Sequence, residues 1–138
     1  MTGHSPLVPT VRIEAPGGAV TRFVRSDDPD FRGFGEVYFS SIESGAIKAW
    51  RRHSQASLVV TVAHGEVLFV VKDSAAAGSY VLRAERPERL TIPPGSWFGF
   101  SGLSPETSIV CSFSDMVHDP AEVDRAPSET FPCDWSRP

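Results

Sequence analysis

The stretch SLVVTVAHGEVLFVVKD, residues 57–73, decides the fold class that this sequence favours. Two runs rich in β-branched and aromatic residues, 57–63 and 66–72, flank the dipeptide His64-Gly65. Such a pattern is typical of two strands joined by a tight two-residue turn, with Gly65 at a position that favours a positive φ. The sequence therefore predicts a β-hairpin in this stretch.

Short runs of the same kind recur on both sides of this unit. Turn residues separate them, such as Pro93-Pro94-Gly95, and no window of a dozen residues has a helical period. Many short strands with regular turn signals favour an all-β sandwich or barrel with little helix. The other expected strands cover residues 20–25, 35–42, 45–53, 79–84, 88–92, 96–101 and 108–114.

Length and composition indicate one ordinary globular domain. The chain has 138 residues, 41% hydrophobic and 22% charged, which is enough for one hydrophobic core. A net charge of −4 does not favour binding to nucleic acid, which relies on an excess of basic residues. No apolar run approaches the roughly 18 residues that span a bilayer. The N-terminus has no basic start followed by an apolar stretch, so we expect no signal peptide and a cytoplasmic location.

The organisation expected along the chain is simple. Residues 1–10 are expected to form a flexible N-terminal segment, and residues 11–138 a single domain whose C-terminal tail wraps the outside from about residue 115. Continuous apolar runs such as VLFVV, residues 67–71, predict strands buried on both faces, which favours a homodimer. Two cysteines, Cys111 and Cys133, are expected to be reduced thiols.

Alternation along the strands predicts a pocket between the sheets. Side chains two residues apart share a face, so Arg51 and His53 point the same way, and Lys48 points the opposite way unless a bulge intervenes. If the matching faces of other strands turn inward, the interior combines an acid, two nitrogen bases and a phenol with aromatic walls, as small-molecule sites do. That interior would hold Glu36, Tyr38, Arg51, His53, Phe98, Phe100, Cys111 and Phe113.

A purely structural interpretation fits the same residues. Arg51 and His53 would equally form an exposed edge or an ion pair with Glu36, and Tyr38 and the phenylalanines would be ordinary core aromatics. His118 precedes Asp119-Pro120 in a polar loop and could face in any direction.

Several segments in order carry a family resemblance. FRGFGEVYFS (31–40), GAIKAWRRHSQ (45–55), VAHGEVLFVVKD (62–73), LTIPPGSWFGF (90–100) and HDPAEVDRAP (118–127), followed by FPCDW (131–135), resemble the dTDP-4-dehydrorhamnose 3,5-epimerase family, especially its shorter relatives. The resemblance implies a metal-free cupin jelly roll, typically a dimer with swapped N-terminal strands. It also implies proton chemistry beside a sugar ketone, with a histidine base oriented by an aspartate, a tyrosine acid, and basic residues that stabilise the enolate.

Carried over residue by residue, the resemblance implies a divergent site. Arg32 and Glu36 match an element that contacts the nucleotide diphosphate, and Lys48 matches the arginine that stabilises the enolate. The base histidine falls on Arg51, whose guanidinium cannot act as a base near neutral pH, while a second histidine of some relatives falls on His53.

The remaining family positions depart further. The acid tyrosine falls near Cys111, a second tyrosine near Val117 or His118, and a histidine that follows the proline turn falls on Phe98. Ser128 and Glu129 are the nearest residues to the orienting aspartate. The metal-binding histidines of cupins are not matched either, because their positions hold Arg51, His53 and Phe98. No metal or other cofactor is therefore expected.

Three functions remain open at this point. The first is a metal-independent epimerase or isomerase of a nucleotide-linked keto sugar, with His53 as the base and Lys48 and Arg51 stabilising the enolate. The second is a repurposed isomerase or cyclase of natural-product metabolism that holds an apolar carbonyl compound, and the third is a non-catalytic cupin that binds a small molecule. The residues expected to bind substrate are Arg32, Glu36, Tyr38, Phe98, Phe100, Cys111, Phe113 and His118.

Overall fold

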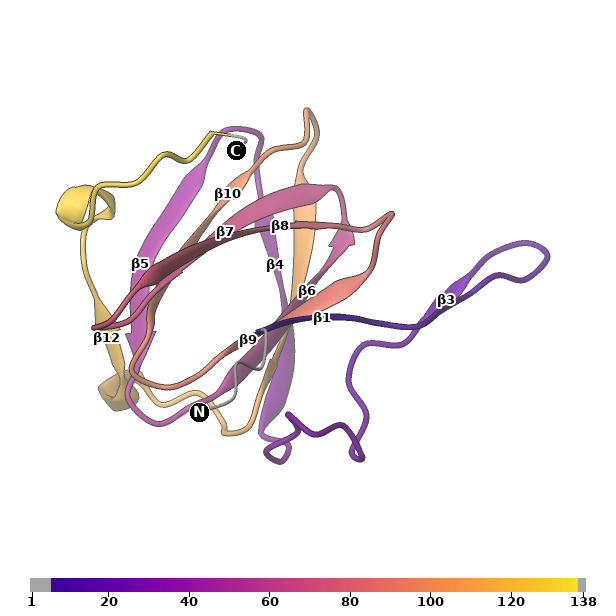
Figure 1. Ribbon diagram of the computed structural model, residues 1–138, viewed down its shortest axis with the longest axis horizontal. Helices are drawn as coiled ribbons and strands as arrows, with labels where there is room; N and C mark the ends of the chain where they lie inside the picture. Colours follow the sequence, from indigo (N-terminus) through magenta and orange to yellow (C-terminus); the bar gives the residue numbers. More distant parts are fainter. Residues whose placement is uncertain (1–5, 137–138) are drawn as a thin grey trace.

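Two antiparallel sheets stacked face to face form the body of the protein (Figure 1). The computed structural model describes residues 6–136. The first sheet has the order β1 (Leu7–Pro9), β9 (Glu88–Ile92), β6 (Leu58–His64), β11 (Ser108–Ser114) and β4 (Glu36–Ile42). The second has the order β12 (Val123–Arg125), β5 (Ile47–His53), β10 (Trp97–Gly102), β7 (Glu66–Lys72) and β8 (Ala77–Arg83).

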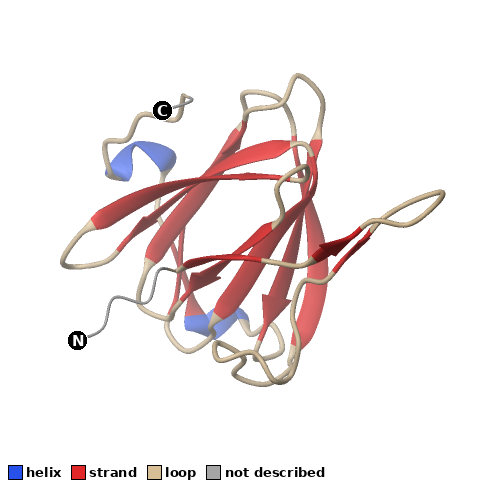
Figure 2. Cartoon of the chain, turned by 45° about the vertical axis from the view of Figure 1, so that its right-hand side comes forward, coloured by secondary structure: helices blue, strands red, loops and turns tan. Residues whose placement is uncertain are grey.

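The remaining elements are short. Strands β2 (Arg12–Ile13) and β3 (Val20–Thr21) form a hairpin that extends away from the sandwich (Figure 1). Two single-turn 3₁₀ helices, η1 (Pro120–Glu122) and η2 (Ser128–Thr130), lie near opposite ends of it (Figure 2). The predicted all-β jelly roll with little helix is confirmed. No helix among residues 6–136 has the length and apolar character needed to cross a membrane.

The N-terminal segment expected to be flexible is described only in part. Residues 1–5 lie outside the described residues. Leu7–Pro9 forms β1, which pairs with β9 so that Leu7 lies opposite Leu90. The Leu7 side chain also packs against the core between the sheets, which accounts for a strand at this position.

The predicted hairpin across His64-Gly65 is wrong. Strand β6 belongs to the first sheet and β7 to the second, so the turn carries the chain from one sheet to the other. Gly65 has the predicted positive φ, 88°, and a Cβ there would lie 2.2 Å from the Oγ of Ser108. The Ser108 hydroxyl accepts a hydrogen bond from the backbone N–H of Glu66 at 3.2 Å. The corner is therefore fixed by close contact with β11, which local sequence does not reveal.

The core lies between the two sheets. The first sheet contributes aliphatic residues, and the second adds Phe69 and Phe98. Each fully buried side chain of this size contributes about 1.5–3 kcal/mol relative to an exposed one. The buried cluster consists of Ile42, Leu58, Val60, Val62, Val67, Phe69, Leu82, Leu90, Ile92, Phe98 and Val110.

The outer face of the second sheet is covered by the C-terminal tail, which Figure 1 shows running outside β5. Trp50 and Leu68 form a second buried cluster there, against which Phe131 and Trp135 pack. The Trp50 indole donates to the carbonyl of Ser128 at 3.0 Å. The prediction that β7 is buried on both faces is confirmed, and the tail of the same chain accounts for it. The homodimer stays a prediction.

The corner at Gly65 gives a stability test. Gly95 has the same φ of 88°, but a Cβ added there would have nothing within 4 Å, so it isolates the backbone cost from the clash with Ser108. We expect Gly95→Ala to lower the free energy of unfolding by about 1–2 kcal/mol, and Gly65→Ala to lower it by a further ~1–3 kcal/mol. Urea denaturation of both variants measures this, and equal losses would contradict the close approach of β11.

Candidate active site

A bulge in β5 brings its basic residues to the same side of the strand. Phe98 pairs with Arg51 and Gly99 with Ala49, so Trp50 is skipped in the pairing with β10. The extra residue shifts the alternation. Trp50 packs outward under the tail, while Lys48 and Arg51 line the same cavity. Strict alternation would place Lys48 on the opposite face from Arg51. The bulge removes this difference, so both residues lie on the interior face of β5.

Two adjoining cavities lie between the sheets. The first, about 290 Å³, is called the polar cavity, and the second, about 350 Å³, the aromatic cavity. Tyr38, Arg51 and Arg125 line both. The polar cavity is completed by Glu36, His53, Ser114, Met116, Val117, His118, Glu122 and Val123. The aromatic cavity is completed by Ser40, Lys48, Ala49, Trp50, Leu58, Val60, Phe69, Phe98, Phe100, Val110, Ser112 and Ala126.

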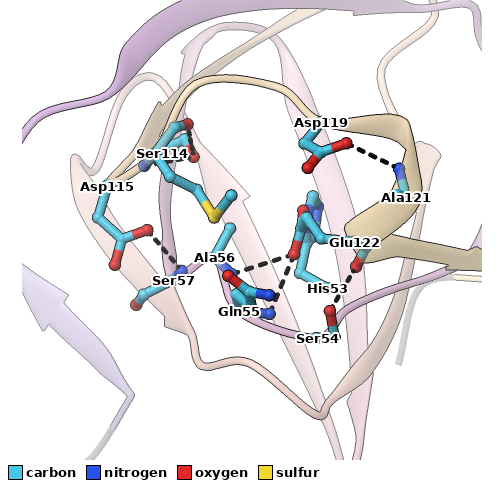
Figure 3. Close-up of polar contacts among 11 residues, drawn as sticks. His53, Ser54, Gln55, Ala56, Ser57, Ser114, Asp115, Asp119, Ala121 and Glu122 are labelled. Carbon is cyan, nitrogen blue, oxygen red and sulfur yellow. Dashed lines mark hydrogen bonds and ion pairs between the residues drawn. The ribbon is translucent and has the colours of Figure 1, made fainter.

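A buried pair of titratable residues, His53 and Glu122, forms one wall of the polar cavity (Figure 3). The two residues are only 8% and 5% exposed, and Nδ1 of His53 is hydrogen-bonded to the Glu122 carboxylate. Nε2 of His53 is buried and has no hydrogen-bond partner among residues 6–136. Because Nδ1 donates to the carboxylate, the lone pair of the neutral ring lies on Nε2. An orienting carboxylate on one ring nitrogen and a lone pair on the other suit a general base, and His53 is one of the residues that line the polar cavity.

Glu122 is held in place by backbone groups around it. Its second carboxylate oxygen accepts hydrogen bonds from the N–H groups of Gln55 at 3.0 Å and Ala56 at 3.1 Å (Figure 3). Helix η1 sets its position, with Asp119 capping the turn by accepting from the N–H of Ala121 at 3.0 Å. Burial raises the pKa of Glu122, but the bonds from His53 and the two N–H groups outweigh it and lower the pKa overall. Glu122 is therefore ionised at neutral pH.

Tyr38 and Arg51 supply a phenol and a cation beside this base. Burial raises the pKa of Tyr38, despite a hydrogen bond with Ser112 and the nearby charge of Arg51, so the phenol keeps its proton at neutral pH. Burial, and then the like charge of Arg125, lower the pKa of Arg51, but a guanidinium stays charged in proteins. The ring of Phe98 stacks parallel to that of His53, with centroids 6.1 Å apart.

Comparisons with known proteins identify relatives among solved structures. No protein-family model matches the chain, and no curated protein matches it. A dTDP sugar isomerase from Desulfovibrio desulfuricans G20 is 32% identical, with a TM-score of 0.88 over 94% of this chain and 88% of that one. The chain belongs to the dTDP-sugar isomerase and epimerase family.

More distant members of the family share the fold. The dTDP-6-deoxy-D-glucose-3,5-epimerase of Legionella pneumophila Philadelphia 1, solved with dTDP-4-keto-L-rhamnose, is 18% identical, with a TM-score of 0.78 over 93% of this chain and 76% of that one. A sugar 3,4-ketoisomerase from Thermoanaerobacterium thermosaccharolyticum, solved with TDP, is 16% identical, with a TM-score of 0.75 over 87% of this chain and 86% of that one. These matches confirm the cupin jelly roll of the family.

Most of the site residues predicted from the sequence line the two cavities. The bulge in β5 explains why Lys48 does so. Alternation along β4 turns Glu36 and Tyr38 inward, and alternation along β10 does the same for Phe98 and Phe100. The predicted residues that line a cavity are Glu36, Tyr38, Lys48, Arg51, His53, Phe98, Phe100 and His118.

The placement of Cys111 and Phe113 in the interior is wrong. They pair with Phe39 and Val37 on the outward face of the first sheet, and Phe113 packs against Phe31 with centroids 5.9 Å apart. Alternation alone does not fix the direction of β11, because both of its alternating sets contain apolar residues. Its inward residues are Val110, Ser112 and Ser114.

Arg32 also lies away from both cavities. Its guanidinium donates to the carbonyls of Pro29 at 3.1 Å and Phe31 at 3.4 Å, within the loop that precedes β4. The role of Arg32 in binding the nucleotide diphosphate therefore stays a prediction. A loop residue carries no alternation signal, so only the family resemblance indicated a role for Arg32.

Two residues that line the cavities, Glu122 and Arg125, are not predicted by the sequence. Neither Ser128 nor Glu129, the nearest matches to the family's orienting aspartate, contacts His53. The Ser128 carbonyl accepts from Trp50 on the outer face of the second sheet, and Glu122 takes the orienting position. Asp119-Pro120 is a recognisable start for a helical turn, but only the fold shows which way that turn faces.

The His53–Glu122 pair gives a pH-dependent stability test. The folded-state pKa of Glu122 lies below its ordinary value of about 4.5, so its stabilising effect is complete above that pH and is lost as the pH falls through the folded-state pKa. We expect Glu122→Gln to lower the free energy of unfolding by about 1–3 kcal/mol at pH 7, and less at pH 3. Urea denaturation across this range measures it.

The exposed Glu129, which does not contact His53, provides the control. Glu129→Gln should change stability by less than about 0.5 kcal/mol at either pH. A loss for Glu122→Gln that is the same at pH 3 and pH 7 would contradict the ionised pairing.

Proposed function

We propose that this protein is a metal-independent isomerase or epimerase that removes a proton beside the carbonyl of a nucleotide-linked keto sugar. The observation that carries the proposal is the buried His53–Glu122 pair in the lining of the polar cavity, in which Nε2 of His53 has no hydrogen-bond partner among residues 6–136. Its support from known proteins is the 32% identity to a dTDP sugar isomerase over most of both chains.

In the proposed reaction, each side chain of the polar cavity takes the step that its chemistry suits. Nε2 of His53 takes the proton from the carbon beside the ketone, and Glu122 stabilises the imidazolium that forms. Arg51 donates hydrogen bonds to the oxygen on which negative charge develops. Tyr38, whose phenol keeps its proton, returns one to the sugar. Glu122 is a positioning residue, because the imidazole of His53 separates it from the substrate.

Lys48 and the phenylalanines assist from the aromatic cavity. The Lys48 ammonium donates to the carbonyl of Ser41 at 2.6 Å and lines the cavity with Phe98 and Phe100. We propose that Lys48 adds positive potential near the enolate, as the family comparison implies, and that the two rings exclude water. Glu36 and His118, at the polar cavity, are proposed to contact the sugar.

Solvent deuterium exchange tests this function. Incubation of the protein with dTDP-4-keto-6-deoxyglucose in heavy water should place deuterium on a carbon beside the ketone, detected by NMR. We expect His53→Gln to slow the exchange by about 10²–10⁴-fold, the usual contribution of a general base. His64→Gln provides the matched control, because His64 is exposed and pairs with Glu106 away from the cavities.

The outcome is decisive in both directions. No deuterium at any carbon beside the ketone, with the folded native protein, would remove the proposed function. Equal losses in the two histidine variants would show that His53 is not the base.

A second candidate is an isomerase or cyclase of an apolar carbonyl compound. The specific observation that favours it is the wall of Phe69, Phe98 and Phe100 in the aromatic cavity. Thermal denaturation separates the two candidates: a rise in melting temperature with dTDP supports the nucleotide sugar, and a rise only with a hydrophobic polyketide-like ligand supports the alternative.

We also propose that the protein is a cytoplasmic homodimer. Both cysteines are free thiols, as a reducing compartment allows. Phe34 and Phe39 are 67% and 70% exposed at the outer face of the first sheet, with Val37 beside them, and such apolar patches commonly mark interfaces.

Light scattering tests the dimer. The native chain should have twice the mass of one chain, and Phe39→Ser should shift it toward the monomer. Ile47→Ser, which changes an exposed residue of the other sheet, should leave the mass unchanged. A monomeric native protein would contradict the proposal.

A further inference from the structure

The lining of the aromatic cavity contains three cations and, among the described residues, no acid. Lys48, Arg51 and Arg125 line it, and none of its other lining residues is an aspartate or a glutamate. Neither arginine forms an ion pair with a carboxylate among residues 6–136. Most of the remaining wall is apolar or aromatic. This cavity therefore suits a ligand that brings its own negative charge to a largely apolar surrounding.

Arg51 and Arg125 lie side by side where the two cavities meet. They are direct partners in the register of β5 and β12, which places their side chains on the same face of the sheet, and both line both cavities. Burial, and then the like charge of Arg125, lower the pKa of Arg51. The neighbouring register pair differs, because Arg52 binds Asp124 at 2.9 Å. The same two strands thus carry one neutralised pair and one doubly positive pair.

The carboxylates of the polar cavity do not neutralise these two arginines. Glu122 accepts hydrogen bonds from His53 on one oxygen and from the N–H groups of Gln55 and Ala56 on the other. Glu36 forms no ion pair with any residue between 6 and 136. A ligand anion can therefore bind at the two guanidinium groups without displacing a carboxylate of the protein.

The position of the two arginines indicates which part of a nucleotide sugar would carry this charge. In the proposed function Arg51 holds the ketone oxygen, and Tyr38, which lines both cavities with it, returns the proton. In a 4-keto sugar, the ketone carbon lies across the ring from the carbon that bears the nucleotide diphosphate. Arg125, the neighbour of Arg51, therefore lies beside the part of the sugar that is remote from the diphosphate. Carbon 6 is the substituent there that can be an acid.

We propose that the substrate is a nucleotide-linked keto sugar with a carboxylate at carbon 6, a 4-keto hexuronate, and that Arg125 binds this carboxylate while Arg51 holds the enolate oxygen. This inference rests on the proposed function and names its substrate class. Removal of the proton between the ketone and the carboxylate leaves two negative charges on neighbouring groups. Two adjacent guanidinium groups, whose parallel N–H donors fit such oxygens, match both charges.

The reaction balances without a co-reactant. Nε2 of His53 takes the proton from the carbon that bears the carboxylate, the C–H electron pair forms a C=C bond to the ketone carbon, and the ketone π pair moves onto the oxygen at Arg51. The carbonyl then re-forms, and the C=C pair takes a proton from Tyr38. The carboxylate stays bound to Arg125, so its C–C bond is not broken and no carbon dioxide leaves. Transfer of one proton from the imidazolium to the phenolate through water restores both groups.

The ligands dTDP-glucuronate and dTDP-glucose test the inference, because they differ only in whether carbon 6 is a carboxylate or a hydroxymethyl group. We expect calorimetric titration of the native protein to give an affinity for dTDP-glucuronate at least about tenfold higher, the gain from one charged hydrogen-bonding partner. Arg125→Gln should bring the two affinities within about twofold of each other. Arg125 is exposed, so this variant should fold, and thermal denaturation checks it.

Arg52→Gln is the matched control on the same two strands. It removes a guanidinium that is already paired with Asp124, so the preference for dTDP-glucuronate should change by less than about twofold. The same loss of preference in Arg52→Gln and Arg125→Gln would show that the effect comes from net charge and would overturn the inference.

Two further results would overturn it. One is native protein that binds the two nucleotide sugars equally or binds neither. The other is Arg125→Gln that weakens both ligands by the same factor, which would assign the arginines to the diphosphate. Deuterium exchange into dTDP-4-keto-6-deoxyglucose tests the proposed function separately. Exchange together with equal affinities overturns this inference alone, whereas absence of exchange overturns the proposed function whatever the affinities are.

Discussion

The hydrogen bond between His53 and Glu122 is the interaction on which the rest of the site depends. It joins β5 to helix η1 across 69 positions of the chain and is buried on both sides. Leaving a buried hydrogen-bonding group without its partner typically costs about 1–3 kcal/mol. Glu122 therefore has to be placed accurately, and the N–H groups of Gln55 and Ala56 do so. The same contacts leave Nε2 as the only ring nitrogen of His53 that can take a proton.

The C-terminal segment performs two tasks at once. Phe131 and Trp135 cover the outer face of the second sheet, which removes apolar surface from water. The residues just before them, in η1 and β12, turn inward and bring Glu122 and Arg125 to the cavities. Packing on the outer face thus fixes the position of groups on the inner face. In a sandwich whose edge strands include β4 and β12, this segment also closes one side of the site.

Prediction from the sequence is most successful where side-chain alternation is strong. The strands from residue 36 to 114 and the inward direction of Tyr38, His53 and Phe98 follow from period-two patterns. It is wrong for Cys111, because apolar residues on both faces of β11 leave the direction undetermined. The hairpin at Gly65 is wrong because a tight turn looks the same within a sheet and between sheets. Glu122 escapes prediction because it comes from a single helical turn, which is too short to have a period.

The central claim is that Glu122 fixes the His53 ring so that Nε2 is the free base. Nitrogen-15 NMR of the histidine rings measures this directly, because the two ring nitrogens of a neutral imidazole have different chemical shifts according to which carries the proton. At a pH where the His53 ring is neutral, we expect a proton on Nδ1 and a bare Nε2, and a shift to the other tautomer in Glu122→Gln. A native ring protonated on Nε2 would contradict the claim.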